Sequence, residues 1–336
     1  MTALFARLNG GAARVALAVA VVATGAALLR PVASAQNAHE AVDLKKITLR
    51  VGDQTGATQS KLKAAGLLDD VPYRIEWSVF AAAVNLHEAL KADAVDTGLA
   101  GDAPTVSAIA GGSPIEAAAA WANGGHGVDL IVPHDSRLKV VADLRGKTVS
   151  PTTRGSIGHY LVLGALKRAG LTPADVSIAF LTPTDAGAAF AAGSIDAWGI
   201  WGVYRARSLG ALKARVLAHG AGIITGLSVL SATRNALSDP GKAAAIADFA
   251  DRVERGYRWS RANREAQIAW YGSFAKQDRT TAEYLYDEEA SYTRVATDDI
   301  LVAQLQNVFA TWVDGGVLKG NIDFHQYVYR GLKVGL

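Results

Sequence analysis

The sequence predicts an α/β fold built from two similar units in tandem, and two observations support that prediction. Between residues 46 and 233, short apolar strand candidates alternate with amphipathic helix candidates, the order typical of mostly parallel sheets flanked by helices. The glycine-bearing turns follow the strands. They should therefore gather at the carboxyl ends of the strands, where open α/β sheets bind ligands.

The first unit is predicted from period-two alternation in its strands and helical spacing between them. Its strand candidates are residues 46–51, 73–79, 94–100 and 115–121, and its helix candidates are residues 57–67, 84–92 and 101–110. Each strand except the last is followed by a helix, which indicates parallel neighbours in one sheet.

A cluster of glycines at residues 123–127 separates the second unit, where the alternation resumes. Its strand candidates are residues 129–132, 147–150, 177–181, 197–201, 215–218 and 226–233. Its helix candidates are residues 160–169 and 185–192, and a short helical turn is predicted at residues 136–144. After residue 239 the alternation of strands and helices gives way to helices with polar faces. They are predicted at residues 243–261, 264–275, 281–285 and 298–313.

The turn at residues 153–160 lies between a strand candidate and a helix candidate. A strand, a Gly/Ser turn and a helix in that order direct free backbone N–H groups and the positive end of a helix dipole at one spot. Such a spot can hold an anion. The simpler interpretation is a capped helix, in which Ser156 caps the helix and Gly155 makes the turn.

The first 35 residues have the pattern of an export signal. Arg7 and Arg14 form a basic region, an apolar run reaches Leu29, and residues 33–35 (Ala-Ser-Ala) fit a cleavage site. The alternative is an uncleaved anchor. Residues 1–35 contain no Arg-Arg pair, which argues against twin-arginine export.

Charge and cysteine content exclude several classes of function. Residues 1–35 hold three arginines and no acidic residue, so the remaining chain has 31 basic and 31 acidic residues and a formal charge of zero. This balance gives no reason to expect binding to nucleic acid or to an anionic membrane surface. The chain has no cysteine, which excludes disulfides, thiol chemistry and cysteine–metal sites.

Six segments together carry a resemblance to a known family. They read Leu-Arg-Val-Gly-x-Gln-x-Gly at 49–56, Gly-Asp-Ala-Pro at 101–104, Val-Ala-Asp-Leu-Arg-Gly-Lys-x-Val at 141–149, Arg-Gly-Ser-x-x-His at 154–159, Leu-Thr-Pro-x-Asp-Ala at 181–186 and Gly-x-Ile-Asp-Ala-Trp-x-Ile-Trp at 193–201. In this order and spacing they resemble the periplasmic solute-binding proteins of ABC importers for aliphatic sulfonates, with nitrate and taurine binders as near relatives. The resemblance covers residues 46–235. The chain departs from the family at Ile157-Gly158, where small hydroxyl or alanine residues are usual, and at Gly202-Val203, where Asp-Pro is common.

The resemblance implies a two-lobed type II periplasmic binding fold, with two crossover strands joining the lobes and the ligand in the cleft between them. One lobe is expected to contain residues 36–125 and 226–336, and the other residues 126–225. Each lobe should be a mixed, mostly parallel sheet flanked by helices. The expected protein is a periplasmic monomer without a cofactor and without enzymatic activity. Its expected partners are an ABC permease and the ATPase subunits of that importer.

A sulfonate is a tetrahedral monoanion with three acceptor oxygens, so the site needs hydrogen-bond donors. On this view Gly155, Ser156 and Ile157 offer backbone N–H groups, and the Ser156 hydroxyl is a further donor. Gln54 adds an amide N–H from the first unit, and His159 belongs to the same motif as the anion turn.

Five further residues complete the expected site, and four of them have a structural alternative. Asp102 orients Gln54 or pairs with a ligand amine, or it caps a helix. Trp198 and Trp201, near Asp196, form an apolar wall for the ligand's alkyl part, or they pack in the core. Arg154 attracts the anion from a distance, or it is solvated at the rim.

Three other classes of function remain alternatives. Ser156, His159 and Asp196 have the residue types of a hydrolase triad, but the Gly-x-Ser-x-Gly pattern is absent and the histidine lies in the same helix as the serine. A metal site at His87 and Glu88 is disfavoured because adjacent helix residues point apart. An exported protein that presents a surface to a partner is the third class. Within the binding proteins, nitrate, taurine or a pyrimidine are the alternative ligands.

Overall fold

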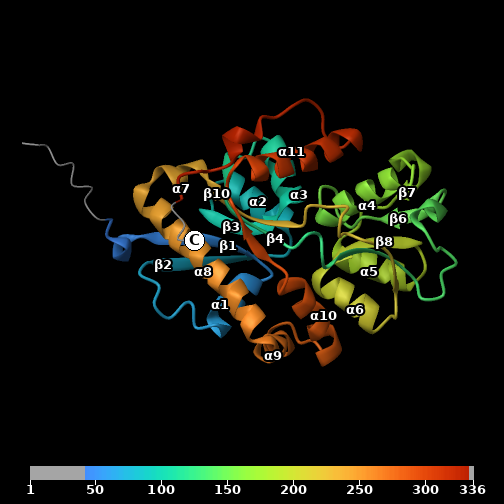
Figure 1. Cartoon of the computed structure of the whole chain (residues 1–336), viewed down its shortest axis with the longest axis horizontal. Helices are drawn as coiled ribbons and strands as arrows, with labels where there is room; N and C mark the ends of the chain where they lie inside the picture. Colours follow the sequence, from blue (N-terminus) through green and yellow to red (C-terminus); the bar gives the residue numbers. More distant parts are fainter. Residues whose placement is uncertain (1–41, 333–336) are drawn as a thin grey trace, which may run out of the picture. The chain divides into compact units, whose positions relative to one another are not determined.

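The computed structural model describes residues 42–332, except the side chains of residues 288 and 289. The predicted export signal at residues 1–35 lies outside the described residues. None of the described helices is long and apolar enough to cross a membrane. Figure 1 shows strands β1–β4 and β10 on the left and strands β6–β8 on the right, and both groups belong to one compact unit of the chain.

The first sheet has six strands in the order β11-β4-β10-β3-β1-β2. Its strands are β1 (Thr48–Gln54), β2 (Arg74–Phe80), β3 (Thr97–Gly101), β4 (Ile115–Ala122), β10 (Leu227–Thr233) and β11 (Thr293–Val295). Its helices near the strand ends are α1 (Ala57–Ala64), α2 (Ala83–Lys91) and α3 (Asp102–Ala110). Strands β1–β4 share one direction, and β10 and β11 run opposite to them.

The second sheet has five strands in the order β7-β6-β8-β5-β9. Its strands are β5 (Val128–Val132), β6 (Thr148–Ser150), β7 (Ser177–Ile178), β8 (Ala197–Trp201) and β9 (Arg215–His219), and its helices are α4 (Ile157–Arg168), α5 (Pro183–Ala191) and α6 (Gly202–Gly210). Here only β5 runs against the other four. The prediction of two mixed, mostly parallel α/β sheets flanked by helices is therefore confirmed.

The chain passes between the sheets twice, at residues 123–127 and 220–226, and the two passages touch. The N–H of Asn123 donates to the carbonyl oxygen of Gly226 at 3.0 Å. A β-carbon added to Gly125 would lie 2.6 Å from the carbonyl oxygen of Gly220, so the passages can pack this closely only where side chains are absent. The strand that precedes the first passage and the one that follows the second, β4 and β10, pair antiparallel.

The C-terminal part is helical, as predicted. It contains α7 (Arg234–Ser238), α8 (Pro240–Ala262), α9 (Arg264–Phe274), α10 (Arg279–Glu289), α11 (Asp299–Asp314) and the 3-10 turn η4 (Phe324–Tyr327). Two further 3-10 turns lie earlier in the chain, η1 (Leu44–Lys46) and η3 (Pro173–Asp175). Helices α8 and α10 begin earlier than predicted because Asp239 and Asp278 cap them through backbone N–H groups of the first turn.

Two predicted elements are shorter than expected. The short helical turn predicted at residues 136–144 covers only the 3-10 turn η2 (Val141–Leu144), because the Asp143 carboxylate accepts the N–H groups of Lys139 and Val140 and turns the chain there. The strand predicted at residues 177–181 covers only Ser177–Ile178. The sequence also predicts none of α6, α7 and β11.

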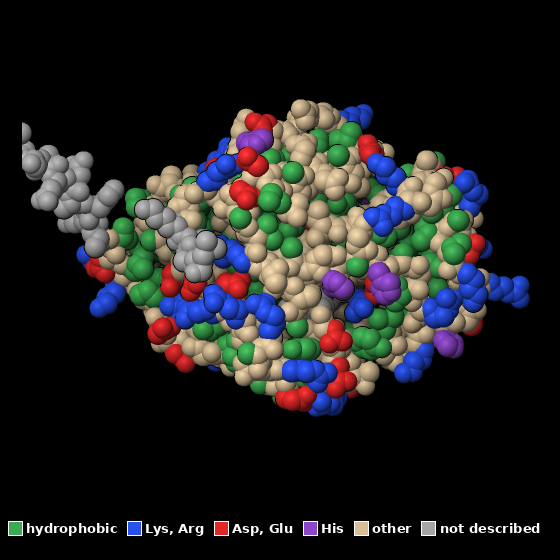
Figure 2. Space-filling model, viewed as in Figure 1, with side chains coloured by type: hydrophobic (Ala, Val, Ile, Leu, Met, Phe, Trp, Pro, Cys, Tyr) green, Lys and Arg blue, Asp and Glu red, His purple; other side chains and the backbone are tan. Residues whose placement is uncertain are grey.

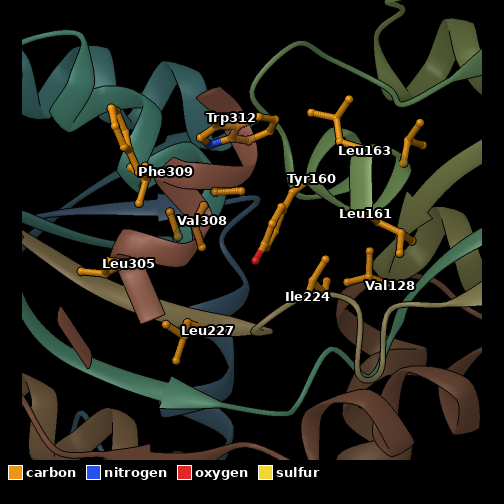
Figure 3. Packing of buried hydrophobic residues seen from close by; sticks show 14 of the residues in the cluster. Val128, Tyr160, Leu161, Leu163, Ile224, Leu227, Leu305, Val308, Phe309 and Trp312 are labelled. Carbon is orange, nitrogen blue, oxygen red and sulfur yellow. The ribbon is translucent and has the colours of Figure 1, made fainter. Parts of the chain in front are cut away.

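One hydrophobic cluster joins helices from both halves of the unit. Figure 3 shows Tyr160 of α4 between Trp312 of α11 and Ile224 of the second passage. The ring centroids of Tyr160 and Trp312 are 6.0 Å apart. Helix α11 also packs against α3 beside the first sheet, so it holds α3 and α4 together.

Acidic and basic side chains are interspersed over the face shown in Figure 2. Charged side chains also pair below the surface: the buried Arg252 side chain binds both Asp70 and Asp248, at 2.5 and 2.6 Å. Such pairing fits the balanced composition of the chain.

Candidate ligand-binding cleft

A cavity of about 300 Å³ is lined by residues that follow strands of both sheets. From the first sheet come the ends of β1 and β3, with Gln54 and Gly101. From the second sheet come Thr153 after β6 and Trp201 at the end of β8. Both passages between the sheets also contribute, as does Tyr257 of α8. The carboxyl ends of the strands of both sheets therefore open onto one cleft.

Helix starts converge on this cleft. Among the described helices, six have a residue of the first turn or the N-cap in its wall: Ala57 for α1, Ala83 for α2, Gly101 for α3, Ile157 for α4, Pro183 for α5 and Gly202 for α6. The first N–H groups of a helix have no partner inside the helix, and the helix dipole is positive at this end. The wall therefore favours an anion.

The helix starts differ in whether a side chain already accepts a hydrogen bond from an N–H group of the first turn. Ser156 caps α4 by accepting the N–H of His159, and Thr182 caps α5 by accepting that of Asp185. The N-cap residues of α2 and α6, Ala82 and Trp201, accept no such bond. The starts of α2 and α6 therefore leave N–H groups for a ligand, and at α4 the cap uses only the N–H of His159 and not that of Ile157.

A lysine that the sequence analysis missed lies in the same wall. Lys61 of α1 is 8 % exposed, and its Nζ lies 4.4 Å from the centroid of the Tyr257 ring. Of the lining residues that the structure describes, Lys61 alone carries a formal charge. Its spacing offered a signal: it follows Ala57, at the helix start, by four residues, which places both on one face of α1.

Much of the remaining wall is apolar or aromatic, although polar residues such as Thr55, Asn123 and Ser228 also line it. Trp201, Tyr204, Tyr257 and Tyr292 contribute rings. The aliphatic lining residues include Leu99, Val128 and Leu227. The cleft thus combines N–H donors and one cation with a surface suited to a small apolar group.

Four of the ten predicted site residues line the cleft: Gln54, Ser156, Ile157 and Trp201. The Ser156 hydroxyl, however, is engaged within the turn. It donates to the carbonyl oxygen of Pro151 at 3.0 Å and accepts the N–H of His159 at 3.2 Å. The contact between Ser156 and His159 is that of a helix cap.

Three other predicted residues lie behind the turn and do not line the cleft. The N–H of Gly155 donates to Nδ1 of His159 at 3.2 Å, so it points away from the ligand space. Burial, with a smaller contribution from the Arg154 charge, lowers the pKa of His159 to about 4. The Arg154 guanidinium itself lies 4.2 Å from the centroid of the Phe180 ring.

The remaining three predicted residues are also outside the cleft wall. Trp198 packs in the core at 1 % exposure, and its indole N–H donates to the Thr152 hydroxyl at 3.1 Å. Asp196 accepts the N–H of Thr148 at 2.8 Å. Asp102 is fully buried and accepts the N–H groups of Ala103 and Leu227 at 2.6 and 3.2 Å.

No group of three or more His, Cys, Asp and Glu side chains in the described part of the chain is placed to hold a metal ion. His87, weighed above with Glu88, is buried, and its Nε2 lies 3.3 Å from the Thr105 hydroxyl.

Two mixed α/β sheets, two passages between them and a cleft at their strand ends define the fold class of the periplasmic binding proteins. The chain belongs to the NMT1/THI5-like family, whose model matches residues 80–266.

The chain is also similar to individual proteins over long stretches of sequence. A protein of Escherichia coli (strain K12) named for binding aliphatic sulfonates is 36 % identical over 175 residues, which span 51 % of this chain and 54 % of the relative. The match thus covers about half the length of that relative.

Among solved structures, the periplasmic aliphatic sulphonate-binding protein SsuA from Escherichia coli gives a TM-score of 0.74 at 29 % identity, over 84 % of this chain and 92 % of that one. The alkanesulfonate-binding protein SsuA from Xanthomonas axonopodis pv. citri, bound to MOPS, gives 0.75 at 25 % identity, over 84 % and 98 %. The desulfurization enzyme DszB shares the fold alone, with a TM-score of 0.62 at 13 % identity.

Proposed function

We propose that this chain is the substrate-binding component of an ABC importer. It captures an aliphatic sulfonate in the cleft and delivers it to a membrane permease served by ATPase subunits. The observation that carries the proposal is the convergence of six helix starts on one cleft, together with an aromatic wall. The relatives named for sulfonate binding support the same ligand class.

The anionic head group is bound mainly by backbone N–H groups. The first turns of α2, α4 and α6 supply donors, and Gln54 adds a side-chain amide. Lys61 adds positive charge on the first-sheet side of the cleft. Three sulfonate oxygens require several donors but no second formal charge, which this arrangement satisfies.

The alkyl part of the ligand lies against the aromatic wall, with Trp201 as its main contact. This assignment replaces the predicted pair of tryptophans, because Trp198 is in the core. Nitrate has no apolar part and would leave this wall unused. Taurine carries an ammonium group, which an apolar wall does not stabilise.

The other predicted residues support the site without lining it. His159 and Gly155 shape the turn before α4, and Asp102 links the start of α3 to Leu227. Asp196, which directly precedes β8, binds the N–H of Thr148 at the start of β6. Arg154 contributes long-range attraction to anions. In this proposal the protein binds and releases its ligand unchanged and needs no cofactor.

We also propose the lobe assignment given above: residues 36–125 with 226–336, and residues 126–225. The strands of the first sheet fall within the first set and those of the second sheet within the other. Residues 1–35 direct export to the periplasm, where the protein acts as a monomer.

A thermal-shift panel on residues 36–336 tests the ligand class. Pentane-1-sulfonate, taurine, sulfate and nitrate are each added at equal concentration. A ligand that binds only the folded state raises the midpoint by mass action, by an amount equivalent to about 2.7 kcal/mol at 100 times its Kd. The largest shift should come from pentane-1-sulfonate. A shift with nitrate or taurine alone would replace the proposed ligand class by that one.

A further inference from the structure

The turn before α4 is held in an unusual backbone conformation. Thr152 and Gly155 both have positive φ, at 66° and 78°. Thr153, Ser156 and Ile157, in and next to this turn, line the cleft. The shape of the turn therefore decides where the first N–H groups of α4 point.

The residues that hold the turn come from three sides. The Thr152 hydroxyl donates to the carbonyl oxygen of Gly199 in β8 at 2.7 Å. The Ser156 hydroxyl donates to the carbonyl oxygen of Pro151 at 3.0 Å. In the third contact, the N–H of Gly155 donates to Nδ1 of His159 at 3.2 Å. Of these three hydrogen bonds, this one alone has a side-chain ring as its acceptor.

The ring of His159 is itself fixed by packing. It is 3 % exposed and lies 5.0 Å, between centroids, from both Phe180 and Trp312. Trp312 belongs to α11, which also packs on α3 beside the first sheet. To accept the N–H of Gly155, Nδ1 has to be unprotonated, so the neutral ring carries its proton on Nε2.

We propose that His159 is a positioning residue for the ligand site. Its unprotonated Nδ1 holds the N–H of Gly155, keeps that group out of the cleft and fixes the turn that presents Thr153 and Ile157. The packing of α11 on the ring supports this geometry from the first-sheet side. The part of the inference that concerns ligand affinity rests on the proposed function; the part that concerns the turn does not.

Two substitutions separate the acceptor from the packing. His159→Asn keeps an acceptor, because Oδ1 of asparagine occupies nearly the place of Nδ1, but it removes most of the ring. His159→Phe keeps a ring between Phe180 and Trp312 but removes the acceptor. Tyr160→Phe is the matched control, since Tyr160 is the next residue of α4 and also packs on Trp312.

Three readouts are compared in these variants: the Kd for pentane-1-sulfonate, the midpoint of thermal unfolding, and the hydrogen-exchange rate of the Gly155 amide by NMR. In His159→Phe we expect the Gly155 amide to exchange faster and the affinity to fall by about 2- to 10-fold, because the turn no longer holds Thr153 and Ile157 in place. The lost intramolecular hydrogen bond should also lower the midpoint of thermal unfolding. In His159→Asn we expect a lower midpoint with an affinity and a Gly155 exchange rate near those of the wild type. Tyr160→Phe should leave the Gly155 exchange rate unchanged. In the wild type, the ¹⁵N shifts of the His159 ring should report a proton on Nε2.

Two results would overturn the inference. One is a His159→Phe variant whose Gly155 exchange rate equals that of the wild type. The other is a His159→Asn variant that loses affinity as far as His159→Phe does, since the ring would then matter only for packing. If the wild type binds no sulfonate at all, the proposed function fails, and the Gly155 exchange rates still decide the positioning role.

Discussion

The hydroxyl of Thr225 donates a hydrogen bond to the Asp102 carboxylate, which joins the start of α3 to the second passage between the sheets. The same carboxylate accepts the N–H of Leu227 at 3.2 Å. Burial outweighs these hydrogen bonds and raises the pKa of Asp102 to about 6. A carboxyl group at the junction of both halves of the cleft therefore titrates within the range of mildly acidic media.

Asp102→Asn should change how stability depends on pH. Because folding raises the pKa of Asp102 above its ordinary value, the protonated form favours the folded state, and this contribution is lost as pH rises through about 6. The difference in unfolding free energy between the wild type and Asp102→Asn should fall by roughly 2 kcal/mol between pH 4 and pH 7. Urea denaturation of both proteins at several pH values measures this difference.

The two buried histidines, His87 and His159, do not affect the difference in stability between the wild type and Asp102→Asn. Burial lowers the pKa of His87 and of His159 to about 4, so they destabilise the fold as pH falls from 6.5, the opposite trend. Both residues are present in both proteins, and their effect cancels in the difference. Parallel stability curves for the two proteins would mean that Asp102 keeps an ordinary pKa.

Gly158→Ala should destabilise the protein. A β-carbon at this position would lie 2.6 Å from the carbonyl oxygen of Gly199 in β8, so α4 or the strand would have to move. This contact gives a structural reason for a glycine at position 158. We expect a loss of about 1–3 kcal/mol, measured by urea denaturation.

The control for this substitution is Gly272→Ala in α9. Its added β-carbon would lie 3.7 Å from its nearest neighbour, an ordinary contact. Stability should stay the same or rise slightly, because alanine favours a helix more than glycine does. Equal losses in both variants would mean that the α4–β8 contact is not the cause.

Trp201→Ala and Trp198→Ala should have different effects. Trp201 lines the cleft, so its removal should weaken binding of hexane-1-sulfonate more than binding of methanesulfonate, since each buried methylene contributes about 0.8 kcal/mol. Trp198 is buried in the core, so its truncation should cost about 3–5 kcal/mol of stability. Calorimetric titration and thermal unfolding of both variants measure the two effects. Equal loss for both sulfonates in Trp201→Ala would place the alkyl part elsewhere.

The sequence predicted the two sheets well because their signals are local. Period-two alternation and glycine turns are properties of short segments, and the order of strands and helices follows from them. Helix α6 escaped prediction for a tertiary reason: its residues Val203 and Ala206 pack against α9 and α10, more than 50 residues away in sequence.

The site was only partly predictable, because its walls come from distant segments. Lys61 and Tyr257 meet only once α1 and α8 pack together. For Ser156 and Gly155, the sequence correctly showed possible donors, but not that the carbonyl oxygen of Pro151 and the ring of His159 already use them. Hydrogen-bond direction depends on the folded geometry, which composition and spacing do not encode.

The central claim is that backbone N–H groups at helix starts bind the anion, and proline at position 157 tests it most directly. Ile157 is the first residue of α4, where proline is tolerated, and Ser156 before it is extended (φ −78°, ψ 168°), as a residue preceding proline must be. Ile157→Pro therefore removes one N–H from the cleft wall and leaves the helix intact. Ile157→Ala is the control, because it shortens the side chain and keeps the N–H.

The measurement is a calorimetric titration of the wild type and both variants with pentane-1-sulfonate, with circular dichroism to verify folding. A hydrogen bond to a charged acceptor is worth about 1.5–3 kcal/mol, so Ile157→Pro should bind roughly 10- to 150-fold more weakly than the wild type. Ile157→Ala should lose far less. A folded Ile157→Pro that binds as tightly as Ile157→Ala would contradict the account and place the anion away from the start of α4.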